Sequence, residues 1–336
     1  MIKLSVRESL IKYLTSILRS SDGTLLVVLC DLDGLSIAKI GRKSEFEINP
    51  NQITSLASAA FSVSEENWED LEIKDQVISF TYFEKVCLIT IKINQTLLTI
   101  VHDYNEYWPL DADGLASSMY YLKQKLGEFF GGKKSSEQEL EAFSNKVRSA
   151  IYLIGMGSDI PFVSYTPENY DPSNPLPAIS QILDSIKNPI FIRYALADPS
   201  GLMLDARELD GKQLPISIEA FSANATVAYQ KMKEESSQSS MGDLLFYLAI
   251  SGQNSENFFG IITCPSGILE FSKKRDVSNI QEISFIGLFS LDYGGIPIIA
   301  EARNIIYSIL EILGTEKTTE NFIKAANTLL SARYEQ

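Results

Sequence analysis

The residues that most often carry out protein chemistry are scarce in this sequence. It contains one histidine, His102, and three cysteines, Cys30, Cys87 and Cys264, which lie far apart. No CxxC or HxxxH spacing occurs, so the clustered ligands of an ordinary zinc site are missing. A His-based triad would have a single candidate base, and His102 ends an apolar run that favours a buried structural role. We therefore expect no catalytic site, no metal centre and no bound cofactor.

Other patterns approach known motifs and then depart from them. Residues 127–133 have the GxxxxGK spacing of a phosphate-binding loop, but Lys134 replaces the magnesium-binding Ser or Thr, and the segment ends a helix instead of opening one. The acidic run at 65–75 lacks the alternating ligands and the glycine of a calcium loop. Single arginines such as Arg42 and Arg193 are more often solvated or ion-paired than used as arginine fingers. None of these patterns predicts an active site.

Composition places the chain among soluble globular proteins of the cytoplasm. Its 336 residues include 29 Lys plus Arg and 43 Asp plus Glu, and the net charge of −14 argues against nucleic acid as a partner. Scattered cysteines in strand-like runs indicate reduced, buried thiols. Residues 1–18 mix Arg7, Glu8 and Lys12 into their apolar spacing, which is typical of neither a signal peptide nor a membrane span. No transmembrane segment is expected.

The apolar spacing of the first half predicts the order helix, two strands, helix, three strands, helix. An amphipathic helix covers 5–18, and the turn Asp31-Leu-Asp-Gly34 joins two strands in a hairpin, because glycine tolerates the positive φ that such turns require. Pro50 opens the middle helix. Three strands follow at 76–83, 85–93 and 96–103, and a last helix covers 114–130.

The same order returns in the second half, and this repeat constrains the fold more than any single motif. The turn Asp-x-x-Gly-Leu that starts at Asp31 recurs at Asp198, an offset of 167 residues. Pro215 again opens the middle helix. The other elements expected in the second copy are helices at 178–186 and 297–313, and strands at 190–197, 202–206, 243–251, 257–264 with a return at 267–271, and 283–291.

These elements divide the chain into four predicted segments. The connector contains a helix at 137–154 that begins with the capping box Ser136-x-x-Glu139, followed by a proline-rich strap. The predicted segments are a first module at 1–132, the connector at 133–176, a second module at 177–316 and a C-terminal helix at 317–336.

The repeated order, with Asp-x-x-Gly-Leu in a hairpin and a small-residue helix after it, resembles the Roadblock family of dynein light chains, within the Roadblock–longin superfamily. The resemblance is carried by 25–38 (LLVVLCDLDGLSIA) and 190–206 (IFIRYALADPSGLMLDA), and it covers 4–131 and 177–315. It implies an α/β (α+β) fold in which each module is a five-stranded antiparallel sheet. The middle helix is expected on one face of that sheet and the other two helices on the opposite face.

Roadblock modules usually dimerise, so the resemblance implies that the two copies form a pseudo-dimer within one chain. Their middle helices would pair, which small residues permit, and their third strands would join into one sheet, which covers an exposed edge. The fusion, the linker and the tail depart from the family, and they leave further oligomerisation open. The residues expected at the interface between the modules are Ala57, Ala60, Phe61, Phe80, Phe221, Ala225, Ala228 and Tyr247.

The family resemblance also implies a function, that of a non-enzymatic platform that binds a small Ras-like GTPase, of the Ras, Rag or Mgl kind. Such a protein regulates or tethers the GTPase without a catalytic residue of its own, and any recruitment to a membrane would occur through its partner. An acidic chain suits a basic partner. The expected docking surface is the exposed side of the paired middle helices, around Gln52, Ser58, Asn224 and Gln230.

Two alternatives remain open from sequence. The first is a small-molecule sensor of the PAS, GAF or profilin-like type, with Phe80, Tyr82, Phe246 and Tyr247 lining a pocket against the sheet. The second is a membrane-traffic adaptor of the longin type, although a longin module begins with strands and this chain begins with a predicted helix.

Overall fold

Helices and strands follow in the same order in both halves of the chain. The computed structural model describes residues 6–43, 47–70, 76–103, 110–130, 135–154, 164–171, 174–186, 191–208, 217–237, 239–251, 259–270, 280–290 and 296–313. The first module consists of α1 (Val6–Arg19), β1 (Thr24–Asp31), β2 (Ser36–Gly41), α2 (Pro50–Asp70), β3 (Gln76–Phe83), β4 (Cys87–Ile93), β5 (Thr96–His102) and α3 (Ala112–Phe129). After the connecting helix α4 (Glu137–Ile154), the second module consists of α5 (Leu176–Ser185), β6 (Phe191–Ala197), β7 (Met203–Glu208), α6 (Ile218–Ser236), β8 (Leu244–Ser251), β9 (Phe259–Glu270), β10 (Ile280–Ser290) and α7 (Ile296–Leu313).

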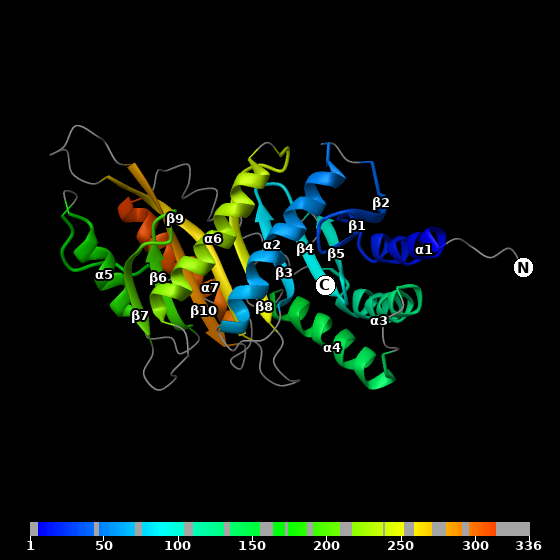
Figure 1. Ribbon diagram of the computed structural model, residues 1–336. Helices are drawn as coiled ribbons and strands as arrows, with labels where there is room; N and C mark the ends of the chain where they lie inside the picture. Colours follow the sequence, from blue (N-terminus) through cyan, green and yellow to red (C-terminus); the bar gives the residue numbers. More distant parts are fainter. Residues whose placement is uncertain are drawn as a thin grey trace, which may run out of the picture.

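All ten of these strands form one continuous antiparallel sheet (Figure 1). Its order is β2-β1-β5-β4-β3-β8-β9-β10-β6-β7, so each module contributes five neighbouring strands, and β3 and β8 join the modules. At this junction Phe80 pairs with Leu248 and Thr81 with Tyr247. The expected fold is confirmed: two Roadblock-like modules form a pseudo-dimer within one chain.

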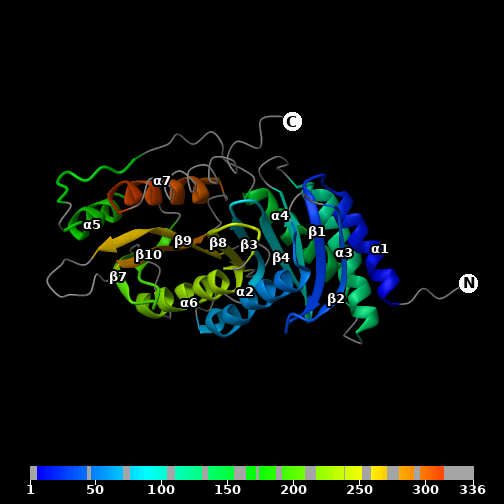
Figure 2. The ribbon, with the colours of Figure 1, turned by 90° about the horizontal axis from the view of Figure 1, so that it is seen from above.

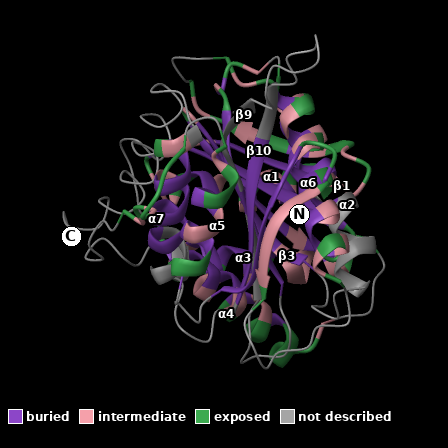
Figure 3. Ribbon diagram, turned by 90° about the vertical axis from the view of Figure 1, so that its left-hand side faces the viewer, coloured by how far each residue is buried: buried purple, intermediate pink, exposed green. Residues whose placement is uncertain are grey.

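The helices divide unequally between the two faces of the sheet (Figure 2). α2 and α6 lie side by side on one face, above a core cluster that includes Ile53, Phe61, Phe221 and Tyr229. The other face carries α1, α3, α4, α5 and α7 over a larger core cluster. The inner strands whose side chains are described are largely buried, whereas the edge strands β2 and β7 are mostly half-buried or exposed (Figure 3). This arrangement places the middle helix of each module alone on its face, as the resemblance implies.

The connector packs against both modules on the five-helix face. α4 lies along α3, where Ser144 Oγ donates a hydrogen bond of 2.8 Å to the Ala116 carbonyl, and Arg148 forms an ion pair of 2.7 Å with Asp113. The strap lies on α7, where Tyr165 Oη donates a hydrogen bond of 2.6 Å to Glu301. The apolar stripe of the predicted 137–154 helix is therefore buried against its own chain.

One predicted boundary in the second module is wrong. The middle helix α6 begins at Ile218, where the Ser217 side chain caps it by accepting a hydrogen bond from the Ala220 N–H. No return occurs after residue 264, since β9 continues to Glu270. The ladder shifts register where Ser284 pairs with Pro265 and Ile283 with Gly267, which lets the strand pass a proline that cannot donate a hydrogen bond.

Several sequence predictions lie outside the described residues. They include Pro215, the C-terminal helix at 317–336, the loop at 131–134 and, in the acidic run, residues 71–75 together with the side chains of 62–70. The four-segment division of the chain stays a prediction.

Candidate interaction surface formed by α2 and α6

The residues considered for catalysis lie buried on strands of the sheet. His102, Cys30 and Cys87 are buried. Burial raises the pKa of Cys30 to about 12 and that of Cys87 well above its ordinary value, so neither thiol is activated as a nucleophile. Among the residues that the structure describes, no group of three or more His, Cys, Asp or Glu side chains could hold a metal ion.

The two arginines considered as arginine fingers have structural partners. Arg42 Nη2 donates a hydrogen bond of 2.8 Å to the Leu18 carbonyl, one of the last carbonyls of α1. The Arg193 guanidinium is buried and lies 2.6 Å from Glu208 on the neighbouring strand β7. Both contacts fit the ion-paired or capping role that is usual for single arginines.

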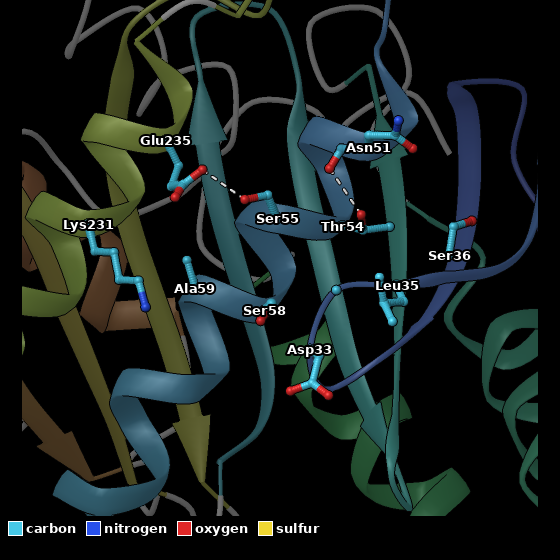
Figure 4. Close-up of a pocket in the computed structure, with 11 residues that line it drawn as sticks. Asp33, Leu35, Ser36, Asn51, Thr54, Ser55, Ser58, Ala59, Lys231 and Glu235 are labelled. Carbon is cyan, nitrogen blue, oxygen red and sulfur yellow. Dashed lines mark hydrogen bonds between the residues drawn. The ribbon is translucent and has the colours of Figure 1, made fainter.

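The α2–α6 pair is the most extensive helix contact between the modules, and it is polar at one end. Ser55 Oγ donates a hydrogen bond of 2.7 Å to Glu235 Oε2, as Figure 4 shows, and Gln52 Nε2 donates one of 3.2 Å to the Glu235 carbonyl. Ala59 lies beside this contact and is buried. A small side chain such as that of Ala59 allows close packing of two helices.

The eight residues expected at the module interface are all buried, but they lie on both sides of the sheet. Phe80 lies at the β3–β8 junction and faces the five-helix side, because side chains alternate along a strand. Seven lie on the α2–α6 side, and six of them belong to its core cluster, while Ala228 is buried within α6. The members of the cluster are Ala57, Ala60, Phe61, Phe221, Ala225 and Tyr247.

Tyr247 forms a buried polar link between the modules. Its hydroxyl donates a hydrogen bond of 3.1 Å to the Ala60 carbonyl of α2 and accepts one of 3.0 Å from Gln76 Nε2 of β3. Burial raises the pKa of Tyr247, so the phenol stays protonated and can donate. A side chain of the second module thus holds a helix and a strand of the first.

The four residues expected at the docking surface are half-buried. Gln52 points into the α2–α6 contact through its bond to the Glu235 carbonyl, and Ser58 donates a hydrogen bond of 2.7 Å to the Leu32 carbonyl of the first hairpin. Asn224 and Gln230 lie on α6. The four residues are thus divided between the two middle helices, and their role in binding stays a prediction.

A groove that the sequence did not predict lies where the modules meet (Figure 4). It has a volume of about 420 Å³, and its walls come from the β1–β2 turn, from α2 and from the last turns of α6. Its charged residues are Asp33, Glu235 and Lys231. The described residues that line it are Asp33, Gly34, Leu35, Ser36, Asn51, Thr54, Ser55, Ser58, Ala59, Lys231 and Glu235.

The repeated Asp-x-x-Gly-Leu motif forms the same turn in both hairpins. Asp31 accepts a hydrogen bond of 2.8 Å from the Leu35 N–H, and Asp198 accepts one of 3.0 Å from the Leu202 N–H. The glycines, Gly34 and Gly201, have φ of 82° and 85°, a region that favours glycine. Each turn lies against its own middle helix, beside Thr54 and Ser58 of α2 or Ala223 of α6.

The four aromatic residues expected to line a small-molecule pocket pack in the core instead. Tyr82 and Phe246 stack with their ring centroids 4.2 Å apart, and Phe80 and Tyr247 are buried in opposite core clusters. None of them lines the groove. These contacts give the sensor alternative no specific support, and the first described element, the helix α1, fits the Roadblock order and not the longin order.

Comparisons with known proteins found one family and several solved structures. Residues 8–106 match the family described as "Mitogen-activated protein kinase kinase 1 interacting". A search of curated protein sequences finds no match to this chain. By its element order and sheet topology each module is Roadblock-like.

Three solved structures illustrate this similarity. They are a Roadblock/LC7 domain from Streptomyces avermitilis (17% identity, 36% of this chain, 96% of that chain, TM-score 0.30), the gliding protein mglB from Thermus thermophilus (14%, 38%, 93%, 0.32) and MglB from Myxococcus xanthus (15%, 38%, 92%, 0.29). Each covers little more than a third of this chain. No helix in the described part of this chain is long and apolar enough to cross a membrane.

Proposed function

We propose that this chain is a non-enzymatic interaction module that binds a small Ras-like GTPase on the face formed by α2 and α6. The observation that carries the proposal is the intrachain pairing of these helices above one ten-stranded sheet, which presents a face assembled from both modules. In the described part of the chain no other helix covers α2 and α6, whereas five helices share the opposite face (Figure 2).

Several observations support binding instead of catalysis. The candidate reactive groups His102, Cys30 and Cys87 are buried in the sheet. The family matched by residues 8–106 is described by an interaction with a kinase, and two of the similar structures are MglB proteins. The net charge of −14 suits a partner with a basic surface.

The proposed contact set contains the four predicted residues, Gln52, Ser58, Asn224 and Gln230, together with Val227 on α6. Val227 is an apolar side chain that remains 49% exposed, and it lies within the stretch of α6 that carries Asn224 and Gln230. Apolar side chains at the centre of a polar rim are where binding energy concentrates in protein interfaces.

The test is direct binding of the purified full chain to a panel of small GTPases from its own cell, each loaded with GDP or with a GTP analogue. We expect at least one GTPase to bind and Val227→Asp to weaken that binding about tenfold or more, which corresponds to about 1.4 kcal/mol. Tyr121→Asp is the matched control, because Tyr121 is 55% exposed on α3, on the opposite face. The proposal fails if no GTPase binds in either nucleotide state, or if the two variants weaken binding equally.

A further inference from the structure

The leucine side chain of the repeated turn motif takes no part in the described core. Leu35 is 68% exposed and Leu202 is 65% exposed, and neither belongs to a core cluster. The Asp and Gly of the motif are explained by the turn, since the carboxylate accepts the leucine N–H and the glycine has positive φ. Only the backbone of each leucine takes part in the turn, so its side chain is left in water.

This exposure occurs twice, at equivalent positions in two copies that differ within the same turn. The first turn contains Leu32 and Asp33, and the second contains Pro199 and Ser200 at the matching positions. A single exposed leucine needs no explanation, whereas two at equivalent sites beside a candidate binding face do. The repetition indicates a surface function for the leucine itself.

Both leucines border the α2–α6 face. Leu35 lines the groove beside Ser58, and the glycine before Leu202 lies against Ala223 of α6. Their parent strands, β1 and β6, are seven strand intervals apart in the sheet order. At about 4.8 Å per interval this is on the order of 34 Å, too far for one pocket to hold both side chains.

We infer that Leu35 and Leu202 are two anchor residues, each of which inserts into an apolar pocket on its own partner molecule. This inference rests on the proposed function, because the partner is the same GTPase. The chain would then hold two GTPase molecules, one at each end of the helix pair, and act as a bridge between them.

The charges beside the first anchor define the chemistry of its partner. Asp33 and Glu235 are exposed at the groove, and among the described residues that line it Lys231 is the single cation. A pocket with a rim of Lys or Arg side chains complements this pair of carboxylates. The second turn has the uncharged Pro199 and Ser200 in the place of this charge. Binding at Leu35 should therefore weaken with salt more than binding at Leu202.

The test uses the full chain and the GTPase found in the panel, with stoichiometry measured by isothermal titration calorimetry and sedimentation velocity. We expect two GTPase molecules per chain for the unaltered protein and for the control Tyr121→Glu. Leu35→Glu and Leu202→Glu should each bind one molecule, and the double variant should lose at least tenfold in affinity. Raising the salt from 50 to 500 mM should weaken the site left in Leu202→Glu more than the site left in Leu35→Glu.

Other results separate the two ideas. If Val227→Asp weakens binding but both leucine variants bind as the unaltered chain does, the anchors are wrong and the proposed function stands. If no GTPase binds in either nucleotide state, the proposed function fails and the anchors fail with it.

Discussion

Removal of the Tyr247 hydroxyl should loosen both modules at once. In Tyr247→Phe the ring still fills its buried site, but Gln76 Nε2 loses the acceptor 3.0 Å away while only 1% of Gln76 is exposed. A buried donor left without its acceptor costs about 1–3 kcal/mol. We therefore expect the free energy of unfolding to fall by about 1–3 kcal/mol, measured by urea denaturation with hydrogen exchange as a second probe.

The regions in which Tyr247→Phe quickens hydrogen exchange show whether the two modules are stabilised together or independently. Because the hydroxyl joins β8 to α2 and β3, hydrogen exchange should quicken in β1 of the first module as well as in β6 of the second. Tyr194→Phe is the control, since its hydroxyl bonds to the Leu183 carbonyl within the second module. Gln76→Leu combined with Tyr247→Phe should recover part of the loss, because neither partner is then left unpaired. Faster exchange confined to the second module in Tyr247→Phe would refute the reasoning.

Two further predictions concern the repeated turn and the buried thiols. Gly201→Ala should lower the free energy of unfolding by about 2 kcal/mol or more, since the φ of Gly201 is +85° and an added Cβ would lie 2.8 Å from Ala223 Cα. Gly34→Ala should lower it by less, because there the added Cβ would lie 3.1 Å from its nearest neighbour, the Thr54 carbonyl oxygen. Urea unfolding checks the order, and equal losses would contradict it. In the native protein a thiol reagent at pH 8 should label neither Cys30 nor Cys87 within the time that labels the unfolded chain, as peptide mass spectrometry would show. Because burial raises the pKa of Cys30 from 9.0 to about 12, its contribution to stability is complete below pH 9 and is lost as the pH rises toward 12; equal stability at pH 8 and pH 11 would contradict this.

The periodic elements and their repeat could be predicted from sequence because local rules determine them. Apolar spacing placed α2 at Pro50, and the Asp and Gly of each turn fixed both hairpins. The β3–β8 junction came from the family resemblance, not from the residues alone. Features that depend on long-range pairing could not be predicted. The residues of β9 do not themselves indicate that the strand continues beyond Pro265, because its pairing with β10 determines this.

The candidate site was less predictable because exposure depends on tertiary packing. From its sequence pattern Leu35 is an apolar residue of the second hairpin strand. In the structure β2 begins one residue later, at Ser36, and the Leu35 side chain is exposed to solvent. Glu235 lies far from Ser55 in sequence, and only the crossing of α2 and α6 brings them together. The repeated leucine was the one available signal, visible once the two turns are aligned.

Binding of a small GTPase on the α2–α6 face can be tested by hydrogen exchange of the full chain, with and without the GTP-analogue form of the GTPase that binds best. We expect slower exchange in α2, in α6 and in the turns at Leu35 and Leu202, with α3 and α4 unchanged. Protection centred on α3 and α4, or no protection on the α2–α6 face despite binding, would contradict it.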